Sequence, residues 1–82
     1  MKDELKQTGM IVSGVVTDVN YVEQIGKHII TLMVSGMDQM LKVSLPKGTL
    51  PDPKKFEIGA VAKMKIVVNF WDGNTYFNEV PA

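Results

Sequence analysis

The amino-acid sequence predicts an all-β domain built from five short strands. From Gly9 onward, β-branched residues recur with little helical spacing, which is typical of strands. Glycine, proline, asparagine and aspartate separate these apolar runs at short intervals, as turns require. With 82 residues, 45% of them hydrophobic, the chain is long enough for one small core. We therefore expect a single domain.

The N-terminal part of the chain divides into a polar start and a first strand. Residues 1–8, MKDELKQT, are mostly polar and half of them are charged, so a mobile segment is expected ahead of a domain at 9–82. The first strand is predicted at 9–17. Its internal Gly14 indicates a bulge or a sharp bend. A polar loop is expected at 18–27.

Four more strands follow, predicted at 28–34, 39–45, 61–70 and 75–80. Between the third and fourth, residues 46–55 hold three prolines and a glycine, which excludes a regular strand or helix. The order is three meandering strands, a long Pro/Gly-rich crossover and a hairpin. This layout predicts a small five-stranded, partly open barrel that is OB-fold-like. A six-stranded barrel of the SH3 type is an alternative that periodicity alone does not exclude.

The fourth strand alternates between two faces. One face is an unbroken apolar stripe and is predicted to be core: Met64, Ile66, Val68 and Phe70. The other face is polar and ends in a tryptophan: Lys63, Lys65, Val67, Asn69 and Trp71. This second face is therefore expected on the outside of the barrel.

The dipeptide Asp72-Gly73 is the strongest hairpin signal, because a type I′ turn needs positive φ at both central residues. With this loop, the expected pairs are Trp71 with Asn74 and Asn69 with Tyr76. If the loop is Gly73-Asn74 instead, Trp71 pairs with Tyr76.

Either even-length loop places Tyr76 on the outer face with Trp71 and sends Phe77 inward with Phe70. A three-residue loop would exchange the faces of the last strand, moving Phe77 out in place of Tyr76. Loop preferences favour the even register.

Charge is unevenly distributed, although the formal net charge is zero. Residues 42–65 carry a local balance of +4, and acids in the flanking segments compensate for it. All nine basic residues are lysine, which lacks the rigid fork that arginine offers to guanine edges and phosphates. Binding of a polyanion should therefore be weakly sequence-specific and salt-sensitive. The alternative is a solvated lysine face that maintains solubility.

Several function classes find no support. The chain has no cysteine, which excludes disulfides and CxxC zinc sites, and its one histidine, His28, has no partners at metal-binding spacing. We expect no metal, no cofactor and no small-molecule substrate. No catalytic motif such as GxSxG or a phosphate loop is present, so we expect no enzyme. Without a signal peptide or membrane span, a cytoplasmic protein that binds no membrane is expected.

Aromatic rings beside lysines are the usual means of binding single strands, because bases stack on rings while lysines neutralise phosphates. Trp71 and Tyr76 are predicted to stack bases, with Tyr21 of the 18–27 loop as a third platform. Phosphate contacts are predicted for Lys42, Lys63 and Lys65, with Lys27 and Lys47 at the margins and Asn69 on the same face. The expected partner is single-stranded DNA or RNA.

The same outer aromatics have an alternative interpretation. Trp71 and Tyr76 would then pack against a loop or form a dimer contact. Aromatic residues are enriched at protein interfaces, so a protein–protein interaction or assembly module that uses the Trp71/Tyr76 hairpin face is the alternative function.

The size and segment order of the chain resemble the single-stranded-DNA-binding proteins of filamentous phages, of the helix-destabilising or gene V type. The resemblance covers about residues 26–82. It rests on Gly26-Lys27 before the second strand, LKVSLPKG (41–48), FEIGAVAKMKI (56–66) and the closing VPA (80–82). QMLKVSLP (39–46) and KKFEIGA (54–60) also resemble small DNA-binding accessory proteins of conjugative elements.

Both resemblances imply a protein of a phage or another mobile genetic element that acts in DNA replication or transfer. The first also implies a homodimer that coats single strands cooperatively. That family's stacking residues lie on its β-hairpins and in the loop after its first strand. Tyr21, Trp71 and Tyr76 are the residues of this chain placed to match them.

Overall fold

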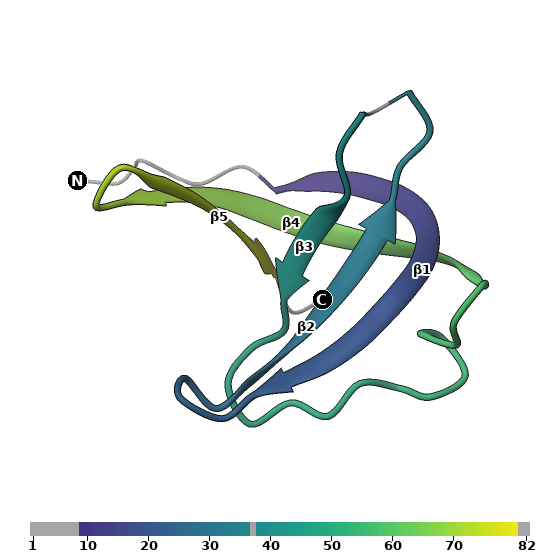
Figure 1. The fold of residues 1–82 in the computed structure, drawn as a ribbon, viewed down its shortest axis with the longest axis horizontal. Helices are drawn as coiled ribbons and strands as arrows, with labels where there is room; N and C mark the ends of the chain where they lie inside the picture. Colours follow the sequence, from purple (N-terminus) through teal and green to yellow (C-terminus); the bar gives the residue numbers. More distant parts are fainter. Residues whose placement is uncertain (1–8, 37, 81–82) are drawn as a thin grey trace.

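The structure is a computed structural model that describes residues 9–36 and 38–80, without the side chain of Trp71. The predicted mobile segment at 1–8 lies outside these residues. Five strands and no helix occur in the described chain (Figure 1). Their bounds are β1, Met10–Val22; β2, Lys27–Met33; β3, Leu41–Ser44; β4, Val61–Trp71; and β5, Asn74–Glu79.

The five strands form one sheet whose hydrogen bonds run in a ring, in the order β1-β2-β3-β5-β4 and back to β1. All neighbours are antiparallel except β3 and β5, which are parallel. A meander of three strands, a long crossover and a final hairpin produce this order, as predicted. The predicted all-β fold with five strands is confirmed, and the ring is compatible with a small, partly open barrel.

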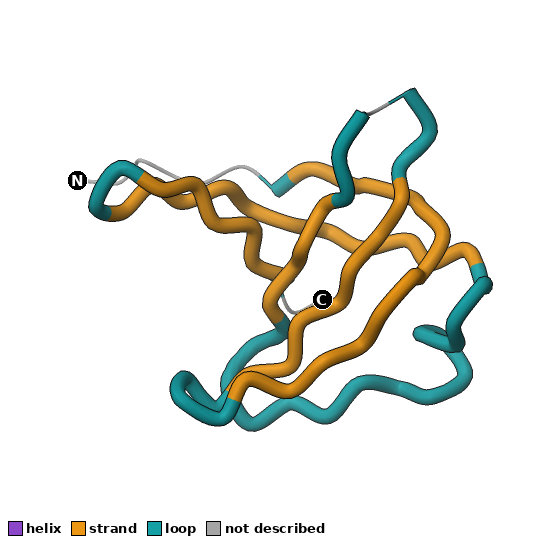
Figure 2. Tube along the Cα trace, viewed as in Figure 1, coloured by secondary structure: helices purple, strands orange, loops and turns teal. Residues whose placement is uncertain are grey.

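The crossover between β3 and β4 has no regular secondary structure and runs along one end of the sheet (Figure 2). Phe56 anchors it, because its ring is buried in the core. Asp52 shapes the turn before Phe56. Its backbone carbonyl accepts from the Phe56 N–H at 2.9 Å, and its side-chain oxygen accepts from the Lys54 N–H at 2.9 Å. The core inside the ring is Val16, Ile30, Leu32, Leu41, Val43, Leu45, Phe56, Ala62, Met64 and Ile66.

Strand β1 is longer than predicted and curls around the ring (Figure 1). It continues through residues 18–22, so the expected polar loop is reduced to the turn at 23–26. β1 pairs with β4 up to Val15 and with β2 from Val15 onward. Gly14 lies at this change of partner, where an added Cβ would come 2.8 Å from the carbonyl oxygen of Met33. The close approach of two backbones explains the glycine.

The bulge itself lies three residues further along, at Thr17. Val16 pairs with Leu32, but Asp18 pairs with Thr31, so one residue of β1 has no counterpart on β2. A bulge of this kind exchanges the two faces of the strand beyond it. As a result Val19 packs against the core and Asp18 is exposed on the outer face.

The register of the β4–β5 hairpin is the predicted one. Trp71 pairs with Asn74, and Asn69 pairs with Tyr76. Asp72 and Gly73 form the loop, with φ of 52° and 77°, as a type I′ turn requires. The even-length loop is therefore confirmed.

Phe70 is not in the core, contrary to the prediction. Met64 and Ile66 are buried as predicted and Val68 is partly exposed, but Phe70 is 77% exposed. β5 pairs with β3 only at Phe77 and Asn78, so the outer part of the hairpin has no third strand beside it and projects from the barrel (Figure 1). Phe77, nearer the barrel, does pack against the core.

Candidate nucleic-acid interface

A groove of about 370 Å³ crosses the outer face of the sheet. It extends over four of the five strands, β1, β2, β3 and β5. Its lining residues are Asp18, Asn20, Val22, Ile29, Thr31, Lys42, Ser44, Thr75, Tyr76 and Phe77. The groove thus combines a lysine, an aromatic ring, an apolar floor and several polar side chains on one surface.

Pairing between the strands arranges these side chains in rows. In one row, Thr31 pairs with Asp18 on one side and with Lys42 on the other. The neighbouring row runs Asn20, Ile29, Ser44 and Asn78. Because hydrogen-bonded strands lie 4.7–4.9 Å apart, Asp18 and Lys42 stand about 10 Å apart across the groove.

Tyr76 extends the first row. Val43 and Ser44 of β3 are level with Phe77 and Asn78 of β5, so Lys42 and Tyr76, one residue earlier on each strand, are also level. The Tyr76 side chain is 43% exposed and lines the groove. The predicted lysine and aromatic of this face are therefore level with each other on adjacent strands and line the same groove.

Asn69 supports the tyrosine from β4. It pairs with Tyr76, and its Oδ1 accepts a hydrogen bond from Nδ2 of Asn78 at 2.9 Å. This side-chain bond joins the two strands of the hairpin beside the ring. Asn69 is thus on the predicted face, where its side chain serves the hairpin.

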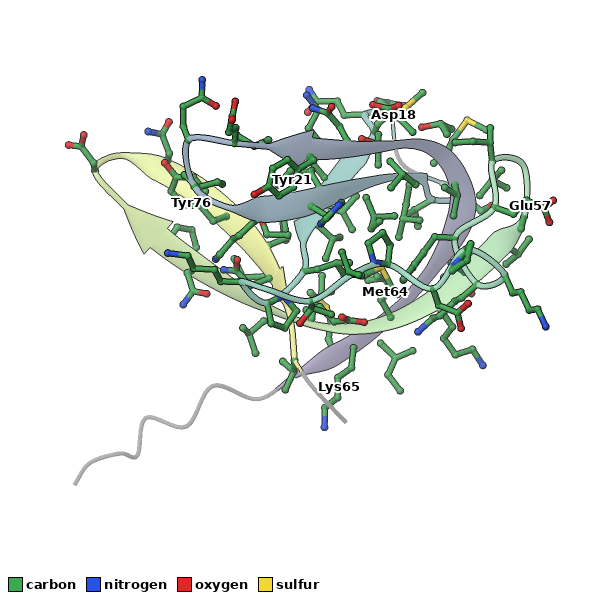
Figure 3. The ribbon with its side chains drawn as sticks, turned by 90° about the horizontal axis from the view of Figure 1, so that it is seen from below. Asp18, Tyr21, Glu57, Met64, Lys65 and Tyr76 are labelled. Atoms are coloured by element: carbon green, nitrogen blue, oxygen red, sulfur yellow. The ribbon has the colours of Figure 1, made fainter. Side chains whose placement is uncertain are left out.

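Tyr21 is not brought into the groove. It lies on β1 instead of in a loop, and beyond the bulge it shares the face of Val19, which packs against the core. Its ring contacts that of His28, with centroids 4.7 Å apart. Together with the loop at 48–50, these rings line a second hollow of about 300 Å³. In Figure 3, Tyr21 lies on β1, and Tyr76 lies on β5 of the final hairpin.

The predicted lysines are not all in the groove. Of the lysines in the described chain, only Lys42 lines the groove. Lys27 pairs with Val22, a groove residue, and so lies at the margin of the groove. Lys47 lies beside Gly26, near the second hollow: a Cβ on Gly26 would be 3.3 Å from its Cε.

Lys63 and Lys65 occupy a different face. They pair with Ser13 and Ile11 on the first half of β1. Lys65 is four residues from Asn69, which corresponds to about 13 Å along the strand. In Figure 3, Lys65 and Asp18 lie on opposite sides of the barrel. These two lysines are therefore separate from the groove.

The backbone of Trp71 pairs with Asn74 at the end of β4. Its side chain lies outside what the structure describes, so the stacking role expected of its ring stays a prediction.

Several groove residues were missed in the sequence. Ser44 shares the alternation that places Lys42 on the outer face, so the sequence signals it. Thr31 lies on β2, where apolar residues occupy both faces, and only its pairing with Lys42 identifies it. The sequence predicts a loop at Asp18 and Asn20, and nothing in the sequence around them marks the bulge that turns them outward.

Comparison of the chain with models of known protein families, with curated proteins and with solved structures found no match. Within residues 9–36 and 38–80, no group of three or more metal-ligating side chains is assembled. The same part of the chain has no helix of the length and hydropathy needed to span a membrane.

Proposed function

We propose that the protein binds single-stranded nucleic acid, DNA in particular, in the groove across β1, β2, β3 and β5. The observation that carries the proposal is the placement of two exposed side chains, Tyr76 and Lys42, level with each other along one groove. A base stacked on an aromatic ring contributes roughly 1–3 kcal/mol, whatever its identity, and an adjacent lysine neutralises a phosphate. Binding by these two contacts is tolerant of sequence.

The position of the groove supports the same proposal. OB-folds bind oligonucleotides on the face of their second and third strands and with the loops after their first and fourth strands. Here the groove floor is formed by Ile29 and Thr31 of β2 and by Lys42 and Ser44 of β3, and β5 of the final hairpin adds Tyr76. A nucleic-acid chain with a phosphate at Lys42 places one base on Tyr76 and its neighbour over Ile29.

The resemblance to the phage proteins points to the same class of ligand. With it, we assign the protein to DNA replication or transfer in a phage or another mobile element, acting in the cytoplasm of the host cell. Lys63 and Lys65 then act as a general attraction for the polyanion from a second face, and the direct phosphate contact in the groove belongs to Lys42.

The test is the affinity for a fluorescein-labelled oligo-dT, measured by anisotropy at about 50 and 200 mM salt. Tyr76→Ala should weaken binding roughly 5- to 150-fold, which corresponds to the loss of one stacked base. Ile58→Ala, an exposed apolar side chain on the crossover outside the groove, is the matched control and should bind as the parent does. A folded Tyr76→Ala variant with unchanged affinity contradicts the proposal.

A second function, self-assembly, is favoured by a different observation. Phe70 is exposed on the face of the hairpin opposite Tyr76, with Val68 on the same face of β4. Met10, which pairs with Ile66, is 50% exposed on that face as well. An apolar surface of this kind on a projecting hairpin suits a second copy of the chain, so the homodimer is proposed to form through Phe70. The assembly surface then differs from the Trp71/Tyr76 face expected from the sequence.

A further inference from the structure

We propose that Asp18 gives the groove a preference for cytosine over thymine at the nucleotide whose phosphate contacts Lys42. The inference rests on the proposed function, because it concerns the same groove. Stacking on Tyr76 makes most of the site tolerant of sequence, and Asp18 adds a preference at one position.

The bulge at Thr17 is what brings Asp18 to the groove. With strict alternation after the Val16–Leu32 pair, Asp18 would pair with Ile30, whose side chain is fully buried. The extra residue shifts the register, so Asp18 pairs with Thr31 and is exposed along the groove. Bulges are over-represented next to functional sites, where they re-aim side chains.

The charge of Asp18 decides which part of a nucleotide it can meet. A carboxylate repels phosphate, and when ionised it only accepts hydrogen bonds. Lys42, at the other end of the Asp18–Thr31–Lys42 row, attracts the phosphate. A nucleotide in the groove is therefore oriented with its phosphate at Lys42 and its base edge toward Asp18, about 10 Å away across two strand spacings.

The floor beside the Asp18–Thr31–Lys42 row suits a base. Ile29 supplies an apolar surface in the neighbouring row, flanked by Asn20 on β1 and Ser44 on β3. A flat ring can lie over Ile29 while its edge reaches the β1 wall. Asp18 is the charged acceptor on that wall.

Cytosine and thymine differ in what they offer to such an acceptor. The exocyclic N4 amino group of cytosine donates to Asp or Glu, and this is an established pairing of side chain and base. Thymine has the O4 carbonyl oxygen at the same position, which a carboxylate repels. Its N3–H donor lies between two carbonyl oxygens. The two pyrimidines have rings of the same size, so the comparison leaves stacking area nearly unchanged.

The experiment compares oligo-dC and oligo-dT of equal length at neutral pH, by anisotropy, for the parent protein and for Asp18→Asn. The parent should bind oligo-dC roughly 3- to 10-fold more tightly, the range expected for one hydrogen bond. In Asp18→Asn the ratio should fall to about one, because an amide can also donate to thymine O4, and oligo-dT should bind more tightly than before. Asp18→Ser, which replaces the carboxylate by a shorter hydroxyl group, should lower the dC/dT affinity ratio as well.

Glu57→Gln is the matched control. It removes one negative charge at an exposed position on the crossover, outside the groove (Figure 3). It should leave the dC/dT ratio of the parent intact. A folded Asp18→Asn variant that keeps the parent ratio overturns the role of Asp18.

Two further outcomes separate this inference from the proposed function. Equal binding of both oligonucleotides by the parent overturns the cytosine preference but leaves single-strand binding standing. Absence of binding to either oligonucleotide overturns both proposals. If Asp18 only repelled the polyanion, Asp18→Asn would raise both affinities by the same factor, and that result also overturns the inference.

Discussion

Asn78 donates a hydrogen bond from its side-chain amide to Oδ1 of Asn69, 2.9 Å away across the β4–β5 hairpin. The bond lies where the hairpin leaves the barrel: Asn78 is level with Ser44 of β3, and Asn69 pairs with Tyr76 further out. A two-stranded ribbon is marginal in water without a third strand. We infer that this side-chain pair stabilises the hairpin beside the groove.

Replacing Asn78 by alanine should therefore lower stability by about 0.5–1.5 kcal/mol, the net value of a typical hydrogen bond. For a domain of this size, about 1 kcal/mol corresponds to a fall in Tm of roughly 4–8 °C. Thermal unfolding followed by circular dichroism measures the change. Asn20→Ala, an exposed amide on β1, is the control. An equal effect of the two substitutions would show that the Asn78–Asn69 bond adds nothing.

Phe70 provides a prediction that separates assembly from folding. Because its side chain is 77% exposed, Phe70→Ser should change stability little but should weaken a homodimer formed through this face. Sedimentation equilibrium over a range of protein concentrations measures the dimer. Ile66→Ala, on the same face of β4 but fully buried, should instead lower stability by about 2–5 kcal/mol. A parent protein that stays monomeric at all concentrations, or a Phe70→Ser variant that dimerises normally, would count against the proposed interface.

The lysines provide a prediction about the path of the nucleic acid. Each phosphate neutralised in a single-strand complex contributes about 0.7 to the slope of log K against log salt. Lys42→Gln should therefore reduce the slope by about 0.7. A double substitution of Lys63 and Lys65 removes twice the charge. It should nevertheless change the slope less, because both residues pair with the start of β1, away from the groove.

Titration of a labelled oligo-dT at several salt concentrations measures these slopes, with Lys54→Gln on the crossover as the control for a general loss of charge. A larger change for the Lys63/Lys65 variant than for Lys42→Gln would place the nucleic acid over β4 and not over β2 and β3. The groove would then not be the principal site.

Much of the fold was predictable because strand signals are local. Apolar runs between turn residues located the strands to within a few residues, except at the end of β1. The Asp72-Gly73 turn determined the hairpin register, since few residues tolerate positive φ at both positions. Alternation then placed Lys42 and Tyr76 on the outer face.

The wrong predictions, the burial of Phe70 and the loop position of Tyr21, have a common cause. Phe70 has the alternation of a core residue, but burial needs another element opposite, and the hairpin extends beyond its contact with β3. Tyr21 was expected in a loop, but β1 continues past it, and the bulge at Thr17 exchanges the faces of the strand before Tyr21 is reached. In each case the local sequence pattern is regular, and the structure differs from the prediction because of how strands that are distant in the sequence pair with each other.

The sequence by itself therefore determined the all-β class, the order of the strands, the hairpin turn and the outward direction of Lys42 and Tyr76. These follow from backbone preferences and from the period of two along a strand, which act within a few residues. Only the tertiary structure decided that Asp18 lies in the same row as Lys42, that Lys63 and Lys65 lie away from the groove, and that Phe70 is exposed. Those outcomes depend on which strands pair and where the pairing stops. Both are set when strands that are far apart in the sequence come together to close the ring.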